Sequence, residues 1–162
     1  MKILTFGEIM LRLKTPEHLR IVQANGFEAS YGGAESNVAV SLSTLGDDAA
    51  FLTKLPDNPV GNAAFNELRR YGVDTSRILR GGPRLGIYYF EKGNDIRPTS
   101  VLYDRAGSAL AKASATEFDW EALLSGIDIF FFSGVTPAIS PSVEQAVSDA
   151  LNYCHTHGIT VI

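Results

Sequence analysis

The stretch SYGGAESNVAVSLSTLG, residues 30–46, places two adjacent glycines directly before a helical pattern. The apolar residues of this pattern recur at the spacing of one helix face, at Ala34, Val38, Leu42 and Leu45. Gly46 follows as a typical helix end. A helix that begins after Gly33 directs unpaired N–H groups toward the preceding chain, and Asn37 lies one turn inside it. Gly32 and Gly33 therefore form either a simple bend or the floor of a binding site.

Strand and helix patterns alternate on both sides of this stretch. Apolar runs typical of strands occupy residues 2–7, 49–55, 127–134 and 159–162. Helical patterns occupy residues 57–72, where Asn58 and Pro59 mark the start, and residues 140–158, where Gly158 marks the end. This alternation predicts a layered α/β domain with a largely parallel central sheet.

Two segments interrupt the alternation. Residues 10–33 are extended and polar, and residues 84–109 have the pattern of a hairpin whose turn lies at residues 92–98. Neither segment fits a strand–helix–strand unit, so we expect them to form a small second sheet that stands off the main one. Its tyrosine, phenylalanine and leucine content leaves one face apolar, and that face needs cover from a ligand or a partner.

The hairpin carries candidate binding residues. Tyr103 and Arg105 share one face of a strand because side chains alternate along it. A phenol beside a guanidinium suits a small, oxygen-rich acid, since arginine binds carboxylates through two parallel hydrogen bonds. On the preceding strand Tyr88 and Tyr89 point to opposite faces, and the register that decides which one faces a ligand stays open. The alternative is an ordinary surface hairpin with a salt-bridged arginine.

Composition and charge exclude several classes of protein. The 162 residues carry a formal net charge of −4 without a cluster of lysine and arginine, which argues against nucleic-acid binding. No apolar run reaches the length of a membrane span. Cys154 is the single cysteine, so an intrachain disulfide is excluded, and His155 and His157 point to different faces of a helix, which disfavours a metal site. We expect a cytoplasmic protein whose partners include neither nucleic acid nor membrane.

Common catalytic fingerprints are missing from the sequence. It contains neither a G-x-x-x-x-G-K-[ST] loop nor a G-x-G-x-x-G segment after a strand, and neither G-x-S-x-G nor H-E-x-x-H occurs. The last residues, 159–162, have the pattern of a core strand, and open α/β sheets place their chemistry in the loops after such strands. We therefore expect this chain to be the N-terminal part of a longer protein.

Several segments occur in an order that resembles a known family. They are GEIMLRL (7–13), FEASYGGAESNVAVSLSTLG (27–46), LTKLPDNPVG (52–61), YGVDTSRI (71–78), GIYYFEKG (86–93) and LYDRAGSAL (102–110). This series resembles the ribokinase-like (PfkB) carbohydrate kinases and, within them, the 2-keto-3-deoxygluconate kinases. The likeness covers the whole chain but matches only the first half of such an enzyme.

The resemblance implies a fold and a set of roles. The fold would be a three-layer sandwich with a mostly parallel central sheet and a β-sheet lid, built from residues of about 10–32 and 84–106. Residues 1–162 would form the N-terminal part of one domain, without its ATP-binding part. The implied sugar-binding residues are Gly32, Gly33, Asn37, Tyr88, Tyr103 and Arg105. Arg105 would lie near the carboxylate of the keto acid.

The resemblance also implies parts that this chain lacks. The catalytic base of the family is an aspartate in a Gly-Ala-Gly-Asp motif, which is not found in residues 1–162 and is expected beyond Ile162. The full-length enzyme would use ATP and Mg²⁺, the chain alone would be inactive, and the lid would form a homodimer with its twin.

The sequence departs from the general family pattern at three places. Glu35 stands where a small residue is usual, and Pro56 stands where glycine is usual. The segment 9–12 lacks the sugar-binding aspartate expected of a ribokinase, which favours an acid substrate over a neutral pentose. The alternatives are a fructokinase- or ribokinase-type kinase of a neutral sugar, and a non-catalytic fragment that binds a sugar acid or dimerises.

Overall fold

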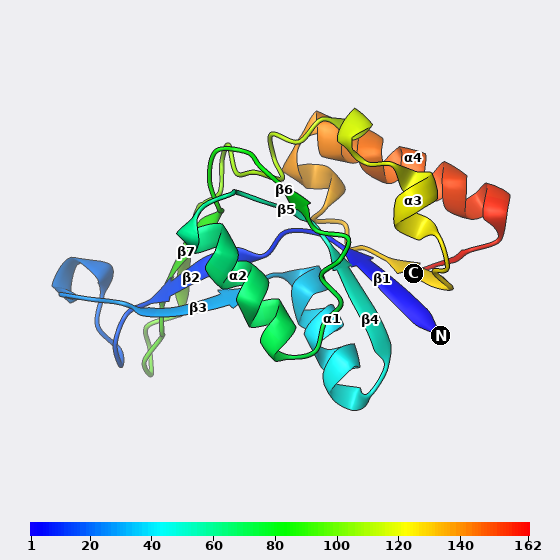
Figure 1. Cartoon of the computed structure of the whole chain (residues 1–162). Helices are drawn as coiled ribbons and strands as arrows, with labels where there is room; N and C mark the ends of the chain where they lie inside the picture. The colour runs from blue at the N-terminus through cyan, green and yellow to red at the C-terminus, as the bar shows by residue number, and fades with distance from the viewer.

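The computed structural model describes residues 1–162 and is built around a four-stranded sheet in the order β10-β9-β1-β4 (Figure 1). Its strands are β1 (Lys2–Phe6), β4 (Asp48–Leu52), β9 (Ile129–Phe131) and β10 (Thr160–Val161). All neighbouring strands of this sheet run parallel. The prediction of an α/β fold with a parallel central sheet is therefore confirmed.

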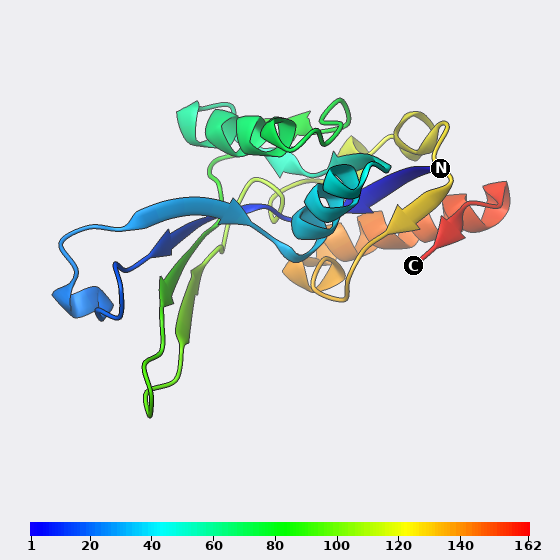
Figure 2. The same ribbon diagram turned by 90° about the horizontal axis from the view of Figure 1, so that it is seen from below.

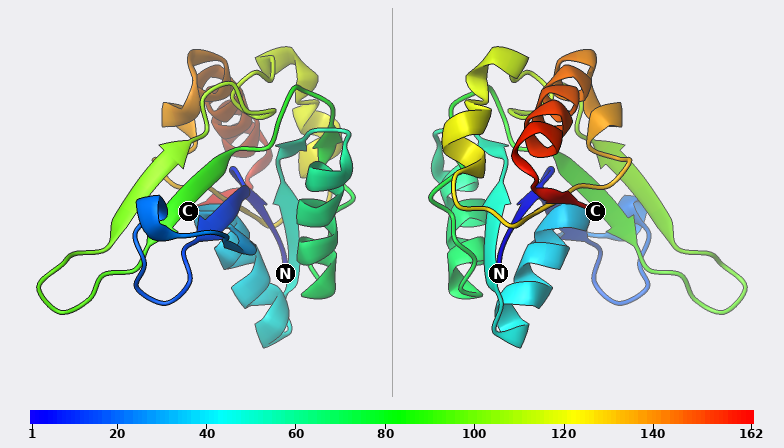
Figure 3. Two further views of the ribbon diagram at one scale, coloured as in Figure 1. Left: turned by 90° about the vertical axis from the view of Figure 1, so that its left-hand side faces the viewer. Right: turned by 90° about the vertical axis from the view of Figure 1, so that its right-hand side faces the viewer.

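Helices cover both faces of this sheet and complete three layers (Figure 2 and Figure 3). The helices are α1 (Ala34–Leu45) and α2 (Pro59–Arg70) on one face, and α3 (Trp120–Leu124) and α4 (Pro141–His157) on the other. Phe51 of β4 joins an apolar cluster with Ala39 of α1 and Leu68 of α2. Phe6 of β1 faces the opposite way and joins a larger cluster with Trp120. The alternation of side chains along each strand thus supplies two separate cores.

Capping groups confirm three of the predicted helix boundaries, whereas α2 ends at Arg70, two residues before the predicted end at Gly72. Asn58 precedes α2, and its side-chain oxygen accepts hydrogen bonds from the N–H groups of Val60 and Gly61. Gly46 (φ 96°) and Gly158 (φ 69°) end α1 and α4 in the left-handed conformation that favours glycine. Helix α3 was not predicted from the sequence, because a helix of five residues is too short to show a helical period.

One predicted strand is wrong in its extent. The sequence predicts a single strand over residues 49–55, but β4 ends at Leu52, and β5 (Lys54–Leu55) pairs with β6 (Leu79–Arg80) in a separate two-stranded sheet. The break after Leu52 is caused by the end of the neighbouring strand β1. Gly7, just after β1, donates its N–H to the carbonyl of Leu52, and beyond this point the chain turns away from the main sheet. The residues after Leu52 therefore find a different partner.

A second sheet extends away from the helices, at the opposite end of the molecule from both termini (Figure 2). Its order is β3-β2-β7-β8, with β2 (Met10–Lys14), β3 (Glu28–Gly32), β7 (Ile87–Glu91) and β8 (Ser100–Asp104). The β2–β7 pair is parallel and the two outer pairs are antiparallel. This confirms the predicted second sheet, which we call the lid sheet.

Three short 3₁₀ turns complete the chain, η1 (Ile21–Gln23), η2 (Ala115–Glu117) and η3 (Pro137–Ile139). None of the helices combines the length and the apolar character that crossing a membrane requires.

Candidate functional site

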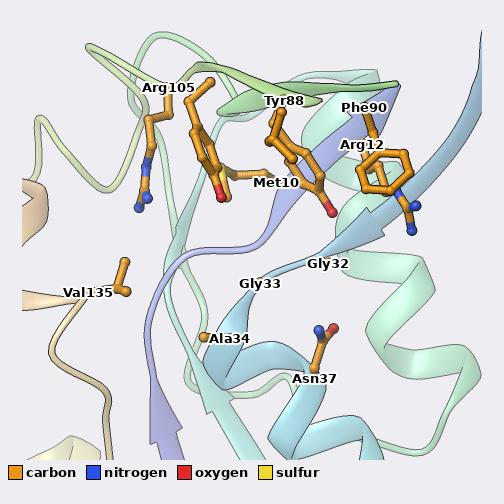
Figure 4. A pocket seen from close by; sticks show the side chains of 12 residues that line it. Met10, Arg12, Gly32, Gly33, Ala34, Asn37, Tyr88, Phe90, Arg105 and Val135 are labelled. Atoms are coloured by element: carbon orange, nitrogen blue, oxygen red, sulfur yellow. The ribbon is translucent and has the colours of Figure 1, made fainter. Parts of the chain in front are cut away.

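A pocket of about 340 Å³ lies where the lid sheet meets the start of α1 (Figure 4). It is lined by all six residues that were implied as sugar-binding, namely Gly32, Gly33, Asn37, Tyr88, Tyr103 and Arg105. These residues come from β3, α1, β7 and β8, from the segment that directly follows β8, and, for Gly33, from the junction between β3 and α1. The fold therefore brings together residues that are up to 73 positions apart in the sequence, from Gly32 to Arg105.

The strand register settles which tyrosine faces this pocket. Tyr88 and Tyr103 lie directly opposite each other on β7 and β8, and their ring centroids are 5.9 Å apart. Tyr89 points to the other face of the lid sheet, where its ring packs edge-on against Phe27. Burial raises the pKa of Tyr88, so its hydroxyl stays protonated at neutral pH and can donate a hydrogen bond to a ligand oxygen.

The two glycines form the floor of the pocket and serve different purposes. A Cβ atom at Gly33 would lie 1.9 Å from the carbonyl oxygen of Glu8, so the close approach of two backbone segments excludes any side chain there. A Cβ atom at Gly32 would lie 3.4 Å from Asn37 Oδ1 and 3.6 Å from the Tyr88 hydroxyl, which is ordinary contact. Gly33 therefore permits the fold, whereas Gly32 leaves room inside the pocket.

Arg105 is already paired with a carboxylate. Its Nη2 atom lies 2.6 Å from Oε2 of Glu8, whose side chain is 5% exposed. The two atoms are within ion-pair distance but are not aligned as a hydrogen bond, so Oε2 has no hydrogen-bond donor. Glu8 was not assigned to the site from the sequence, because only the tertiary structure brings the segment after β1 beside the segment after β8.

The contacts of Glu35 explain why this position carries a glutamate where the family pattern has a small residue. It lies in the first turn of α1, is 2% exposed, and accepts hydrogen bonds from the backbone N–H of Ser133, the Ser133 hydroxyl and the Thr136 hydroxyl. These partners belong to the segment after β9, which also places Val135 in the pocket wall. The hydrogen bonds of Glu35 therefore connect the start of α1, at the pocket floor, to the segment that carries Val135.

Other residues of the pocket were not assigned to the site from sequence. They include Met10, Arg12, Phe90 and Val135. Side chains alternate along a strand, so Met10 and Arg12 share one face of β2, and Tyr88 and Phe90 share one face of β7. Once Tyr88 is known to face the pocket, this alternation also predicts that Phe90 faces it.

No three or more His, Cys, Asp or Glu side chains lie together in a way that could hold a metal ion. His155 and His157 lie at the end of α4, where the ring of His157 stacks on that of Tyr153.

Comparisons with known proteins agree with this geometry. The pattern of the pfkB family of carbohydrate kinases matches residues 1–162. A 2-dehydro-3-deoxygalactonokinase of Haloferax volcanii is 41% identical over 159 residues, which cover 98% of this chain and 50% of that protein. The crystal structure of a 2-dehydro-3-deoxygluconokinase from Thermotoga maritima is 51% identical with a TM-score of 0.96, and the match covers 99% of this chain and 49% of that one.

A third match comes from an uncharacterized sugar kinase of Pyrococcus horikoshii that was solved in complex with ATP. It is 25% identical with a TM-score of 0.82, over 94% of this chain and 49% of that one. This chain thus spans about half the length of the curated relatives that it matches.

Proposed function

The chain belongs to the pfkB family of carbohydrate kinases, and we propose that it is the sugar-binding half of a kinase acting on 2-keto-3-deoxygluconate. This compound is also called 2-dehydro-3-deoxygluconate. The observation that carries the proposal is the pocket, in which Arg105, two tyrosine hydroxyls and Asn37 surround a glycine floor. Such a set offers several hydrogen bonds to the hydroxyl, keto and carboxylate oxygens of a small sugar acid.

Each pocket residue has a proposed role. Gly33 and Asn37 contact the sugar, with the Asn37 amide both donating to and accepting from its hydroxyl groups. Tyr88, Tyr103 and Arg105 approach from the lid sheet and hold the keto acid.

The full reaction that we propose moves the γ-phosphoryl group of ATP to the primary hydroxyl of the sugar acid. ATP supplies the phosphoryl group, and Mg²⁺ neutralises part of its charge. We assign no residue of this chain to either, since no cluster of metal-ligand side chains is present. The Gly-Ala-Gly-Asp motif that holds the catalytic base of the family is also absent from the sequence. We therefore expect residues 1–162 to bind the sugar acid without phosphorylating it.

A second candidate substrate is 2-keto-3-deoxygalactonate, which is favoured by the name of the Haloferax volcanii relative. The two acids differ in the configuration of a single carbon, so the same pocket groups suit both. A kinase of a neutral sugar and a non-catalytic binding module are the remaining alternatives.

We also propose that the protein is cytoplasmic and forms a homodimer through the lid sheet. The edge strand β8 supports the dimer because one of its backbone edges is unpaired and because Leu102, which points away from the pocket, is exposed. Sedimentation equilibrium tests this directly, and a monomer at all concentrations contradicts it.

Titration calorimetry without ATP tests the proposed function. We expect saturable binding of one or both keto acids and much weaker binding of D-fructose. Preferred binding of D-fructose supports the neutral-sugar kinase instead. A coupled assay with ATP, Mg²⁺ and the bound acid then tests inactivity, and turnover by purified residues 1–162 contradicts that part of the proposal.

A further inference from the structure

The inner face of the lid sheet carries a second arginine. Arg12 lies on β2, and its register partners are Ser30 on β3 and Tyr88 on β7. Residues that are paired across a sheet point to the same face, so Arg12 stands beside Tyr88 in the pocket wall. Figure 4 shows Arg12 and Arg105 on opposite sides of Tyr88, with Arg12 beside Phe90.

The two arginines differ in how their charge is compensated. Arg105 is ion-paired with the buried carboxylate of Glu8, which offsets most of its charge before a ligand arrives. No carboxylate lies within ion-pair distance of Arg12. The Arg12 charge is therefore free to attract an anion.

The local packing of Arg12 also indicates an unfilled contact. Its guanidinium lies 4.2 Å from the centroid of the Phe90 ring, which holds the guanidinium group in one place. Its Nε atom is buried and has no hydrogen-bond partner. A buried donor without an acceptor costs free energy, and no contact within the chain compensates for that cost, so a bound carboxylate that attracts the guanidinium would offset it.

The surroundings of Arg12 strengthen its pull on an anion. Lys14 and Lys92 line the groove that continues from Arg12 along the lid sheet, and only Lys14 is paired, with Glu28 at 2.8 Å. The positive charge of Arg12 also acts on Tyr88. Burial raises the pKa of that tyrosine, and the Arg12 charge partly opposes this rise. The Phe90 end of the pocket is therefore its positive end.

We propose that Arg12, rather than Arg105, binds the carboxylate of the sugar acid and sets the preference for an acid over a neutral sugar. The inference rests on the proposed function and assigns the carboxylate a different partner from the one that the family resemblance implies. The N–H groups of the two terminal nitrogens of Arg12 match the two oxygens of a carboxylate. Arg105, held by Glu8, then serves the oxygen atoms at the other end of the ligand.

Calorimetry with 2-keto-3-deoxygluconate and D-fructose tests this assignment on four proteins: the unmodified chain, Arg12→Gln, Arg12→Lys and Arg69→Gln. Arg69 is a matched control, because it is also an arginine near an aromatic ring, that of Phe65 at 5.8 Å, but lies on α2 outside the pocket. We expect Arg12→Gln to weaken binding of the acid about ten- to hundredfold, as for a lost charged hydrogen bond, and to leave D-fructose unchanged. Arg12→Lys keeps the charge, so its affinity for the acid should fall less than that of Arg12→Gln. Arg69→Gln should bind the acid as tightly as the unmodified chain.

The outcomes separate this inference from the proposed function. If the unmodified chain binds the acid and Arg12→Gln binds it equally well, only the role of Arg12 is overturned. Equal losses for the acid and D-fructose also overturn it, because they indicate a role in folding the lid sheet. If the unmodified chain does not bind the acid, the proposed function fails and this inference fails with it. Thermal unfolding of each variant identifies a misfolded Arg12→Gln, in which case Arg12→Lys decides between a selective and a uniform loss.

Discussion

Glu8 and Arg105 join the main sheet to the lid sheet through one ion pair, in which Arg105 Nη2 lies 2.6 Å from Glu8 Oε2. Glu8 follows β1, and Arg105 follows β8. The carboxylate is 5% exposed and the guanidinium 25%, so the pair lies at the inner edge of the pocket rather than in open solvent. Its partners come from distant parts of the chain, and we expect it to hold the lid sheet at a set distance from the pocket floor.

Removal of one partner of this pair should cost more than removal of both. Arg105→Ala leaves the Glu8 carboxylate buried without a cation, and we expect a loss of about 2–3 kcal/mol in the free energy of unfolding. The double variant Glu8→Gln/Arg105→Ala removes the stranded charge and should recover most of that loss. Urea denaturation of both variants measures the difference. Equal stability of the single and the double variant contradicts this account of the pair.

The two floor glycines should respond differently to a methyl group. Gly33→Ala places a Cβ atom 1.9 Å from the Glu8 carbonyl oxygen, so the backbone must shift, and we expect a loss of about 1–3 kcal/mol or more in stability. Gly32→Ala meets only Asn37 and Tyr88 at 3.4 and 3.6 Å and should fold normally. Its methyl group narrows the pocket, so its affinity for the sugar acid should fall. Thermal unfolding and calorimetry separate the two effects, and a stable Gly33→Ala variant would argue against the close backbone approach.

Glu35 should be important for stability although it is a charged residue inside the protein. Glu35→Ala removes the carboxylate that accepts from the backbone N–H and the hydroxyl of Ser133, whereas the Thr136 hydroxyl keeps the Phe6 carbonyl as an acceptor. We expect a loss of about 2–4 kcal/mol in the free energy of unfolding. Glu144→Ala is a matched control, since Glu144 also lies in the first turn of a helix but is exposed. It should cost no more than about 1 kcal/mol, the usual size of a helix-dipole contribution. Similar losses in the two variants contradict the role given to the hydrogen bonds of Glu35.

The ion pair between Lys54 and Glu117 should make stability dependent on pH. The hydrogen bond from Lys54, together with the backbone N–H of Ser114, lowers the pKa of Glu117 below its ordinary value of 4.5. Because the folded state favours the ionised carboxylate, this contribution is complete above pH 4.5 and disappears as the pH falls through the lowered pKa.

Lys54→Met should therefore reduce stability at pH 7 and have little effect at strongly acidic pH. The effect at pH 7 should be about 1 kcal/mol or less, because the Glu117 side chain is 38% exposed and solvent screens the pair. Urea denaturation as a function of pH measures it. A destabilisation that is the same at both pH values points to lost packing of the lysine stem instead.

Much of the secondary structure could be predicted because its signals are local. The cap at Asn58 and the helix ends at Gly46 and Gly158 depend on a few neighbouring residues, and each lies where the pattern indicated. The strand over residues 49–55 failed for the opposite reason, since its break depends on where β1 leaves the main sheet. Sequence spacing contains no information on that point.

By itself the sequence determined the alternation of strands and helices, the second sheet, and the six residues that line one pocket. It did so through side-chain periodicity, turn residues and the likeness to a family, all of which can be read along the chain. Only the tertiary structure decided that Tyr88 rather than Tyr89 faces the pocket, that Glu8 neutralises Arg105, and that Arg12 keeps its charge free. The physical reason is that strand register and ion pairing depend on contacts between residues far apart in sequence. A shift of one residue in register would turn the Arg12 and Tyr88 side chains to the other face.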